Sequence, residues 1–200
     1  MRTILILFFL GIVNFGYAQE KFDVAAVEKF QKDLNIEFAD AKKSPLDAED
    51  LKKFKTLDFY PINEKFFVTA KFVITENEKP FEMKTSTDRR PMYIKYGEVL
   101  FTIDGKSFQL NVYKNIELSK KEEYIDYLFL PFSDLTSGSE SYIGGKYIDL
   151  KIPKSDTIAI DFNTSYNPYC TYSHRYSCPI VPLENDLDIE IKAGVKKFHD

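Results

Sequence analysis

The chain has 200 residues, with 27 basic and 31 acidic side chains and a formal net charge of −4. Its content of 44% hydrophobic and 16% aromatic residues is enough to bury a core, which excludes a disordered chain. The acidic balance argues against nucleic acid or an anionic membrane surface as the main partner, because both require a surplus of Lys and Arg.

Residues 1–18 have the pattern of a secretory signal peptide. Arg2 precedes an apolar run over residues 4–13, and small residues stand at positions −3 and −1 of a cut before Gln19. An uncleaved membrane anchor is the alternative, but the run is shorter than the roughly 20 residues that span a bilayer. We therefore expect a periplasmic or secreted protein with no stable membrane insertion after signal removal.

Helical periodicity is confined to residues 22–54. Ser44 followed by Pro45 is typical of a helix start, with Ser44 as the cap and Pro45 in the first turn. The pair predicts a second, short helix that runs through Phe54. The first helix is predicted from apolar residues at spacings of three and four: Phe22, Ala26, Val27, Phe30, Leu34 and Phe38.

After Leu57 the hydrophobic period changes to two, as in half-buried strands. Asp104-Gly105 supplies the turn of the clearest hairpin, between strands at 98–104 and 107–114. On its two sides Val99, Phe101 and Ile103 are expected to face Phe108, Leu110 and Val112. The further strand-like runs are 67–74, 80–85, 91–96, 124–130, 142–151, 157–162 and 186–192.

These elements predict a mainly β fold, an antiparallel sandwich or barrel preceded by N-terminal helices. No repeat, linker or low-complexity tract divides the mature chain. The predicted organisation is a signal peptide at 1–18, an N-terminal helical segment at 19–43 and a single β-rich domain at 44–200.

Familiar catalytic signatures such as GxSxG, HExxH, GxGxxG, the P-loop and CxxC are missing from the chain. A Ser-His-Asp mechanism would have to use His174, because His199 is next to last, where termini usually fray. Whether the protein is an enzyme is therefore left open, and no cofactor is predicted.

Cys170 and Cys178 are separated by seven residues in a chain expected to be exported, which predicts a disulfide. A metal site is the alternative, since His174 falls midway in a C-x3-H-x3-C pattern. Zinc needs three or four ligands, and the fourth would have to be a remote carboxylate or water. Free thiols are the third reading. We predict the disulfide and no metal.

Two polar stretches, 132–150 and 161–185, concentrate hydrogen-bonding side chains between strand-like ends. If they meet at one end of the barrel they can form a polar ligand site, although such residues also satisfy the backbone of long loops. The candidate ligand-binding residues are Asp134, Thr136, Glu140, Tyr142, Tyr147, Asp161, Asn163, Tyr166, Asn167, Glu184 and Asn185.

Three functions are consistent with this pattern. The first is a binding protein for a small polar ligand, with aromatic walls and a few placed polar groups. The second is an extracytoplasmic hydrolase that divides acid and base roles between two carboxylates among Asp134, Glu140, Asp161 and Glu184. The third is a partner of envelope proteins that uses an exposed edge strand.

The strings DFNTSYNPYC (161–170), CPIVPLEN (178–185) and IEIKAGVKKF (189–198) resemble a bacterial and archaeal family of unknown function. Its members carry DFNxxYNPxC, CPxPxxEN and a closing I-x-AGEK, and DLTSGSESYIGGKYIDL (134–150) is similar to another of its blocks. Val195 stands where the family usually has Glu, and Lys146 where it usually has Arg; His174 falls at no fixed position. The family has no assigned activity, so the resemblance implies homology over about residues 40–198 and no reaction.

Overall fold

The computed structural model describes residues 20–198, so the predicted signal peptide lies outside the described residues. The helical region contains α1 (Val24–Ala39), capped by the Asp23 side chain, and the short α2 (Ala48–Lys53). The expected helix start at Ser44 is wrong by a few residues. The Ser44 hydroxyl instead accepts the Leu46 N–H in a local turn, and the helix begins only after Asp47.

Within residues 20–198, eight strands form one sheet, in the order β6-β5-β4-β3-β1-β7, with β2 added to β3 and β8 to β5. All pairs are antiparallel except β5 with β8. The strands are β1 (Phe67–Ile74), β2 (Phe81–Glu82), β3 (Met92–Ile103), β4 (Lys106–Asn115), β5 (Tyr127–Asp134), β6 (Lys146–Lys151), β7 (Thr157–Asp161) and β8 (Asp186–Leu187). The described part of the chain also contains six short 3-10 helices: η1 (Glu64–Phe66), η2 (Leu118–Lys120), η3 (Glu122–Tyr124), η4 (Phe162–Thr164), η5 (Tyr169–Thr171) and η6 (Leu183–Asn185).

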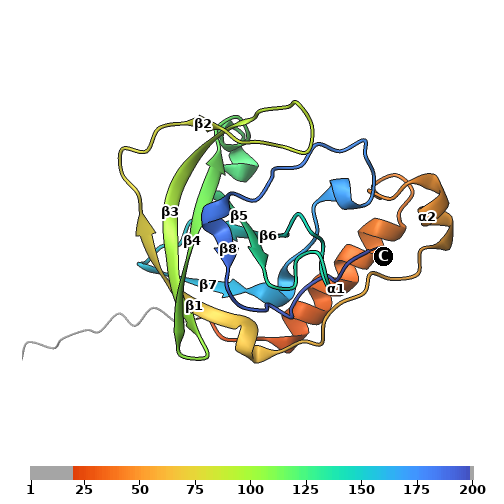
Figure 1. Ribbon diagram of the computed structural model, residues 1–200, viewed down its shortest axis with the longest axis horizontal. Helices are drawn as coiled ribbons and strands as arrows, with labels where there is room; N and C mark the ends of the chain where they lie inside the picture. Colours follow the sequence, from red (N-terminus) through yellow and green to blue (C-terminus); the bar gives the residue numbers. More distant parts are fainter. Residues whose placement is uncertain (1–19, 199–200) are drawn as a thin grey trace, which may run out of the picture.

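The sheet curls into a half-barrel, which confirms the mainly β prediction in its barrel-like form. Figure 1 shows the long β3–β4 hairpin on one side of the molecule and helices α1 and α2 on the other. The two end strands of the sheet, β6 and β7, follow each other in the chain but do not pair. The half-barrel is therefore open between them.

The predicted hairpin forms as expected. Asp104 and Gly105 have φ angles of 52° and 76°, the left-handed values that match the twist of the flanking strands. Across the hairpin Phe101 pairs with Phe108 and Val99 with Leu110. The predicted strands at 91–96 and 98–104 are one strand, because the irregularity between Lys95 and Gly97 bends β3 without ending it.

The main core lies inside the curve of the sheet and includes Leu110, Leu130, Phe132, Ile160 and Phe162, each 0% exposed. A second cluster attaches the helices. In it, the rings of Phe38 on α1 and Phe198 near the C-terminus each pack on Tyr172 at 4.8 Å. Among residues 20–198, no helix has the length and apolar character needed to cross a membrane.

Candidate functional site

The two polar stretches identified in the sequence meet in the folded protein. Tyr147 on β6 and Tyr166 after η4 exchange both backbone hydrogen bonds, at 2.9 and 3.0 Å, and their rings lie 6.0 Å apart. The Tyr147 hydroxyl donates to the carbonyl of Pro179, and the Tyr166 hydroxyl donates to Asp149. Segments around residues 147, 166 and 179 are thereby joined at one end of the half-barrel.

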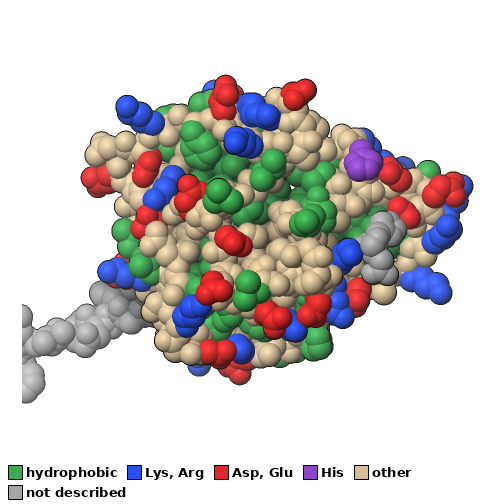
Figure 2. Space-filling view, viewed as in Figure 1, with side chains coloured by type: hydrophobic (Ala, Val, Ile, Leu, Met, Phe, Trp, Pro, Cys, Tyr) green, Lys and Arg blue, Asp and Glu red, His purple; other side chains and the backbone are tan. Residues whose placement is uncertain are grey.

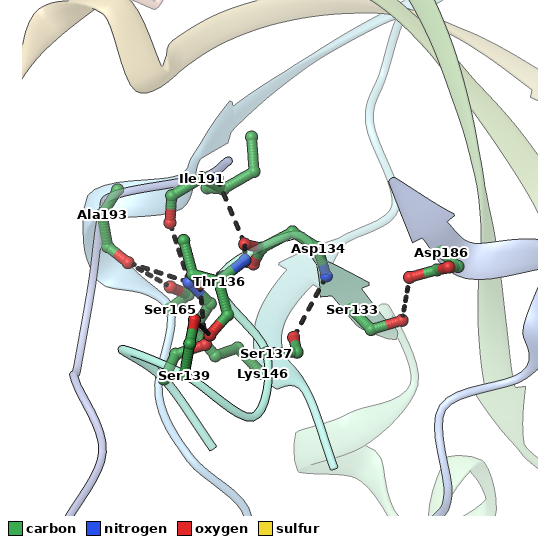
Figure 3. Close-up of polar contacts among 11 residues, drawn as sticks. Ser133, Asp134, Thr136, Ser137, Ser139, Lys146, Ser165, Asp186, Ile191 and Ala193 are labelled. Atoms are coloured by element: carbon green, nitrogen blue, oxygen red, sulfur yellow. Dashed lines mark hydrogen bonds and ion pairs between the residues drawn. The ribbon is translucent and has the colours of Figure 1, made fainter. Parts of the chain in front are cut away.

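A fully buried ion pair ties this region to the C-terminal chain (Figure 3). Lys146 Nζ lies 3.2 Å from Asp134 Oδ2, and both side chains are 0% exposed. The same ammonium donates to the carbonyls of Ile191 (2.9 Å) and Ala193 (3.3 Å), while Asp134 Oδ1 accepts the N–H groups of Thr136 and Ile191. Burial lowers the pKa of Lys146, and the charge of Asp134 acts in the opposite direction.

The remaining polar side chains of the first stretch also serve the protein itself. The Thr136 and Ser141 hydroxyls hydrogen-bond each other at 2.8 Å in a fully buried position. Glu140 is exposed and pairs with Lys192 at 2.9 Å, a surface contact of small energetic value.

In the second stretch, the predicted amides are buried and bonded to backbone groups. Asn163 accepts the N–H of Asn63 and donates to its carbonyl, closing a two-bond clamp to the segment before β1. Asn185 makes the same kind of clamp with Asn111 on β4 and also donates to a carbonyl on β5. Asn167 donates to the Lys196 carbonyl. All three positions are explained by the fold.

The four predicted carboxylates have four different surroundings. Asp134 is buried against Lys146, Glu140 faces Lys192, Asp161 caps η4 through the Asn163 N–H, and Glu184 is exposed. Within the described chain, no hydrogen bond or ion pair joins any two of them. The geometry does not assemble the acid–base pair that a hydrolase of this kind needs.

A groove of about 830 Å³ lies between the end strands β6 and β7, where the half-barrel is open. Its apolar part comes from core-facing side chains, including Ile148 and Ile158. Its polar part includes the carboxylates of Asp149 and Asp161 and the ammonium groups of Lys151 and Lys154. The hydroxyls of Tyr127 and Tyr166 both donate to Asp149 Oδ1 at 2.7 Å. Burial raises the pKa of Asp161, although its hydrogen bonds from Asn163 oppose that rise.

The backbone of β7 presents hydrogen-bonding groups to this groove. Phe72 N–H donates to the Asp156 carbonyl at 2.7 Å. In this register the even-numbered residues of β7 therefore direct their backbone N–H and C=O groups toward β1. The alternation of an antiparallel strand then turns the N–H and C=O of Ala159 away from β1, toward the opening. Among the described strands, none pairs with this edge of β7.

The facing edge of β6 has the same character. Tyr147 exchanges both backbone hydrogen bonds with Tyr166, so the odd-numbered residues of β6 direct their backbone N–H and C=O groups away from β5. Asp149, two residues further along, therefore presents its N–H and C=O to the opening. The groove is lined by two unpaired strand edges above an apolar floor.

Of the predicted ligand residues, only Asp161 lines this groove directly, and Tyr166 reaches it through Asp149. Sequence reasoning missed Asp149 and Tyr127. Asp149 stands in the block 134–150 that resembles the family, whereas no motif marks Tyr127. Their contact follows from the pairing of β5 with β6, and Asp149 lines the groove because β6 and β7 do not pair. Two other hollows, of about 880 Å³ beside β1 and β3 and about 520 Å³ on α1, contain none of the predicted residues.

Tyr142 lies in a third place, beside the two cysteines. Its pKa is raised by burial and by the neighbouring Cys170 thiol. Cys170 and Cys178 are free thiols in contact, with the Cys170 N–H donating to Cys178 Sγ at 3.1 Å. The disulfide stays a prediction for the oxidised protein. Among residues 20–198, no group of three or more His, Cys, Asp or Glu side chains is placed to hold a metal ion.

Comparisons with known proteins agree with the fold. The model of a family described as "Protein of unknown function (DUF1684)" matches residues 52–196. The solution NMR structure of the uncharacterized protein from gene locus rrnAC0354 of Haloarcula marismortui is similar at 29% sequence identity and a TM-score of 0.67. The match covers 86% of this chain and 92% of that one. No curated protein matches this sequence.

Proposed function

We propose that this chain, which belongs to the DUF1684 family of proteins of unknown function, binds a small ligand in the groove between β6 and β7. The observation that carries the proposal is a ligand-sized groove between two unpaired strand edges. Apolar walls with a few placed polar groups are the usual composition of ligand sites.

The ligand we propose has an apolar body and polar groups along its length. The floor, with Ile148 and Ile158, supplies apolar contact, and the backbone edges at Asp149 and Ala159 supply donors and acceptors. The carboxylate of Asp149 is already held in place by two tyrosine hydroxyls, so it is a preorganised acceptor at the rim.

Hydrolysis by paired carboxylates has less support, because the four candidate carboxylates are engaged separately. Export to the periplasm or the exterior remains part of the proposal on the sequence of residues 1–18. Purification from cells expressing the full chain, followed by mass spectrometry, tests it: we expect a mature chain that begins at Gln19.

Ligand binding is tested by screening small molecules with ligand-observed NMR and repeating the measurement on two variants. Ala159→Arg places a long charged side chain at the edge of the groove, whereas Thr102→Arg changes an exposed residue of the other hollow. We expect binders whose signal is lost in Ala159→Arg and kept in Thr102→Arg. Binders that tolerate Ala159→Arg would contradict the proposed site.

A further inference from the structure

The two cysteines are brought together by different parts of the chain. Cys170 belongs to η5, whereas Cys178 is attached to the segment that precedes β3. Ser86 N–H donates to the Cys178 carbonyl at 2.9 Å, and Cys178 N–H donates to Ser86 Oγ at 3.1 Å. Thr85 forms an antiparallel bridge with Pro179 beside them. Cys178 is therefore fixed to the body of the protein by its backbone.

The Cys178 thiol is the first of three groups that favour the thiolate form of Cys170, and the hydroxyls of Ser86 and Tyr142 are the other two. These groups, led by the Cys178 thiol, lower the pKa of Cys170 to about 6 against the opposing effect of burial. The pKa of Cys178 is raised, chiefly because its proton is shared with Cys170.

Accessibility distinguishes the two sulfurs in the same way. Cys170 is partly exposed, whereas Cys178 is buried at 7% exposure. In two-cysteine exchange sites the accessible thiolate attacks and the protected thiol resolves the intermediate. Here the accessible cysteine is also the one that the neighbouring groups stabilise as a thiolate.

Exposed apolar side chains lie next to this pair in the chain. Ile143 follows Tyr142 and is 76% exposed; Ile180 and Leu183 follow Cys178 and are 50% and 92% exposed. Figure 2 shows hydrophobic side chains exposed between charged groups on the face of the molecule that it presents. Exposed apolar side chains on the segments that carry these cysteines and Tyr142 suit a protein substrate better than a small hydrophilic disulfide.

We propose that Cys170 and Cys178 form a thiol–disulfide exchange site whose substrate is a disulfide of another protein. This activity is independent of ligand binding in the β6–β7 groove. The Cys170 thiolate attacks one substrate sulfur, forms a mixed disulfide and expels the other sulfur as a thiolate. Cys178, losing its proton to that thiolate, then attacks Cys170 Sγ and expels the second substrate thiolate.

The balance of this step is a two-electron exchange. The substrate disulfide is reduced to two thiols, and the Cys170–Cys178 pair is oxidised to the disulfide that the sequence predicts. A dithiol of another molecule reverses the process and restores the reduced pair. In contrast to a structural disulfide, this bond is expected to open and close in glutathione buffers.

The first test follows the reduced protein with oxidised glutathione by mass spectrometry. We expect wild type to become two hydrogens lighter, Cys178→Ser to keep glutathione on Cys170, and Cys170→Ser to react far more slowly. Equal reaction of Cys170→Ser, or a wild-type disulfide that glutathione buffers cannot reduce, would overturn the proposal.

The second test measures the pH dependence of Cys170 alkylation by iodoacetamide, with the modified cysteine identified by peptide mass spectrometry, in wild type and in single tyrosine variants. We expect a wild-type midpoint near the pKa of about 6, and an upward shift in Tyr142→Phe. Tyr124→Phe, at a tyrosine that packs on Tyr127, is the matched control and should not move the midpoint. A wild-type midpoint near that of a free thiol, about 8.5, would refute the role of these groups.

The third test separates a protein substrate from a small one. Reduction of insulin disulfides by the reduced protein is compared with reduction of oxidised glutathione. We expect Leu183→Ser and Ile180→Ser to slow insulin reduction by up to about tenfold and to leave the glutathione rate unchanged. Equal rates of insulin reduction by the variants and by wild type would exclude Ile180 and Leu183 from the docking site.

Discussion

A Lys146→Met substitution is expected to lower the free energy of unfolding by about 3–5 kcal/mol, because it leaves the Asp134 carboxylate buried without a counter-charge. Both side chains are 0% exposed, so water cannot replace the missing ammonium without opening the fold. Methionine has a similar length and fills most of the volume, which keeps the packing contribution small.

The hydrogen bonds around the ion pair show which group accounts for most of this loss of stability. The Ile191 carbonyl still accepts the Ala193 N–H, and the Ala193 carbonyl still accepts the Ser165 hydroxyl. Both acceptors therefore keep one partner when Lys146 is replaced. Asp134 keeps two backbone N–H donors on Oδ1 but none on Oδ2, so the unpaired charge accounts for most of the loss.

Urea unfolding followed by circular dichroism measures this difference at pH 7. Lys192→Met is the matched control, since the Lys192–Glu140 pair is exposed and its loss should change stability by less than about 1 kcal/mol. The double variant Asp134→Asn/Lys146→Met removes both charges. We expect it to be more stable than Lys146→Met alone, because no uncompensated charge remains. A deficit no larger than that of Lys192→Met, or a double variant as unstable as the sum of the single ones, would refute the reasoning.

Three further outcomes are expected from urea unfolding. Gly194→Ala should lower the free energy of unfolding by several kcal/mol, because φ is +77° and a Cβ would lie 2.4 Å from a backbone carbonyl oxygen. Gly105→Ala has a similar φ of +76° but open space around the Cβ, so it should lower the free energy of unfolding by only about 1 kcal/mol. Asn163→Ala should cost about 2–3 kcal/mol through its lost clamp, whereas Glu184→Ala should stay within about 0.5 kcal/mol; equal losses would contradict this assignment. Because burial raises the pKa of Asp161, wild-type stability relative to Asp161→Asn should fall as pH rises from 4 to 7, and a constant difference would show that the carboxyl is not perturbed.

The parts of the fold that depend on local pattern could be predicted from the sequence. The change of hydrophobic period near Leu57 separates the helices from the sheet, and the Asp104-Gly105 turn fixes the register of β3 against β4. Residues on both sides of that turn alternate between core and solvent, so their facing partners follow from counting.

The start of α2 could not be predicted correctly, because Ser44 has two local uses with the same sequence signature. Its hydroxyl can cap a helix or accept the N–H two residues on, and here the second use prevails. Asp47 then takes the cap position without a side-chain cap bond. Tertiary contact decides between them: the Arg175 guanidinium donates to the carbonyls of Ser44 and Leu46 and holds the turn open.

The candidate site is harder, because ligand-binding and structural roles use the same residue types. Asn163 and Asn185 were selected for their amides, and those amides bind the backbone groups of Asn63 and Asn111, which are 100 and 74 residues away in the chain. No sequence pattern indicates a contact between residues so far apart in the chain. The β6–β7 groove is likewise invisible in the sequence, since adjacent strands with a short connection normally pair as a hairpin.

The bridge between Tyr147 and Tyr166 also supports the thiol pair. Tyr147 exchanges its outward backbone hydrogen bonds with Tyr166, which follows η4, and not with a residue of β7. The hydroxyl of Tyr166 then positions Asp149 in the groove, while the hydroxyl of Tyr147 holds the Pro179 carbonyl next to Cys178. One pair of tyrosines therefore fixes the rim of the groove and the segment that carries the resolving cysteine. Both proposed sites depend on the same bridge between the two polar stretches, which explains why so many polar side chains there bind the protein itself.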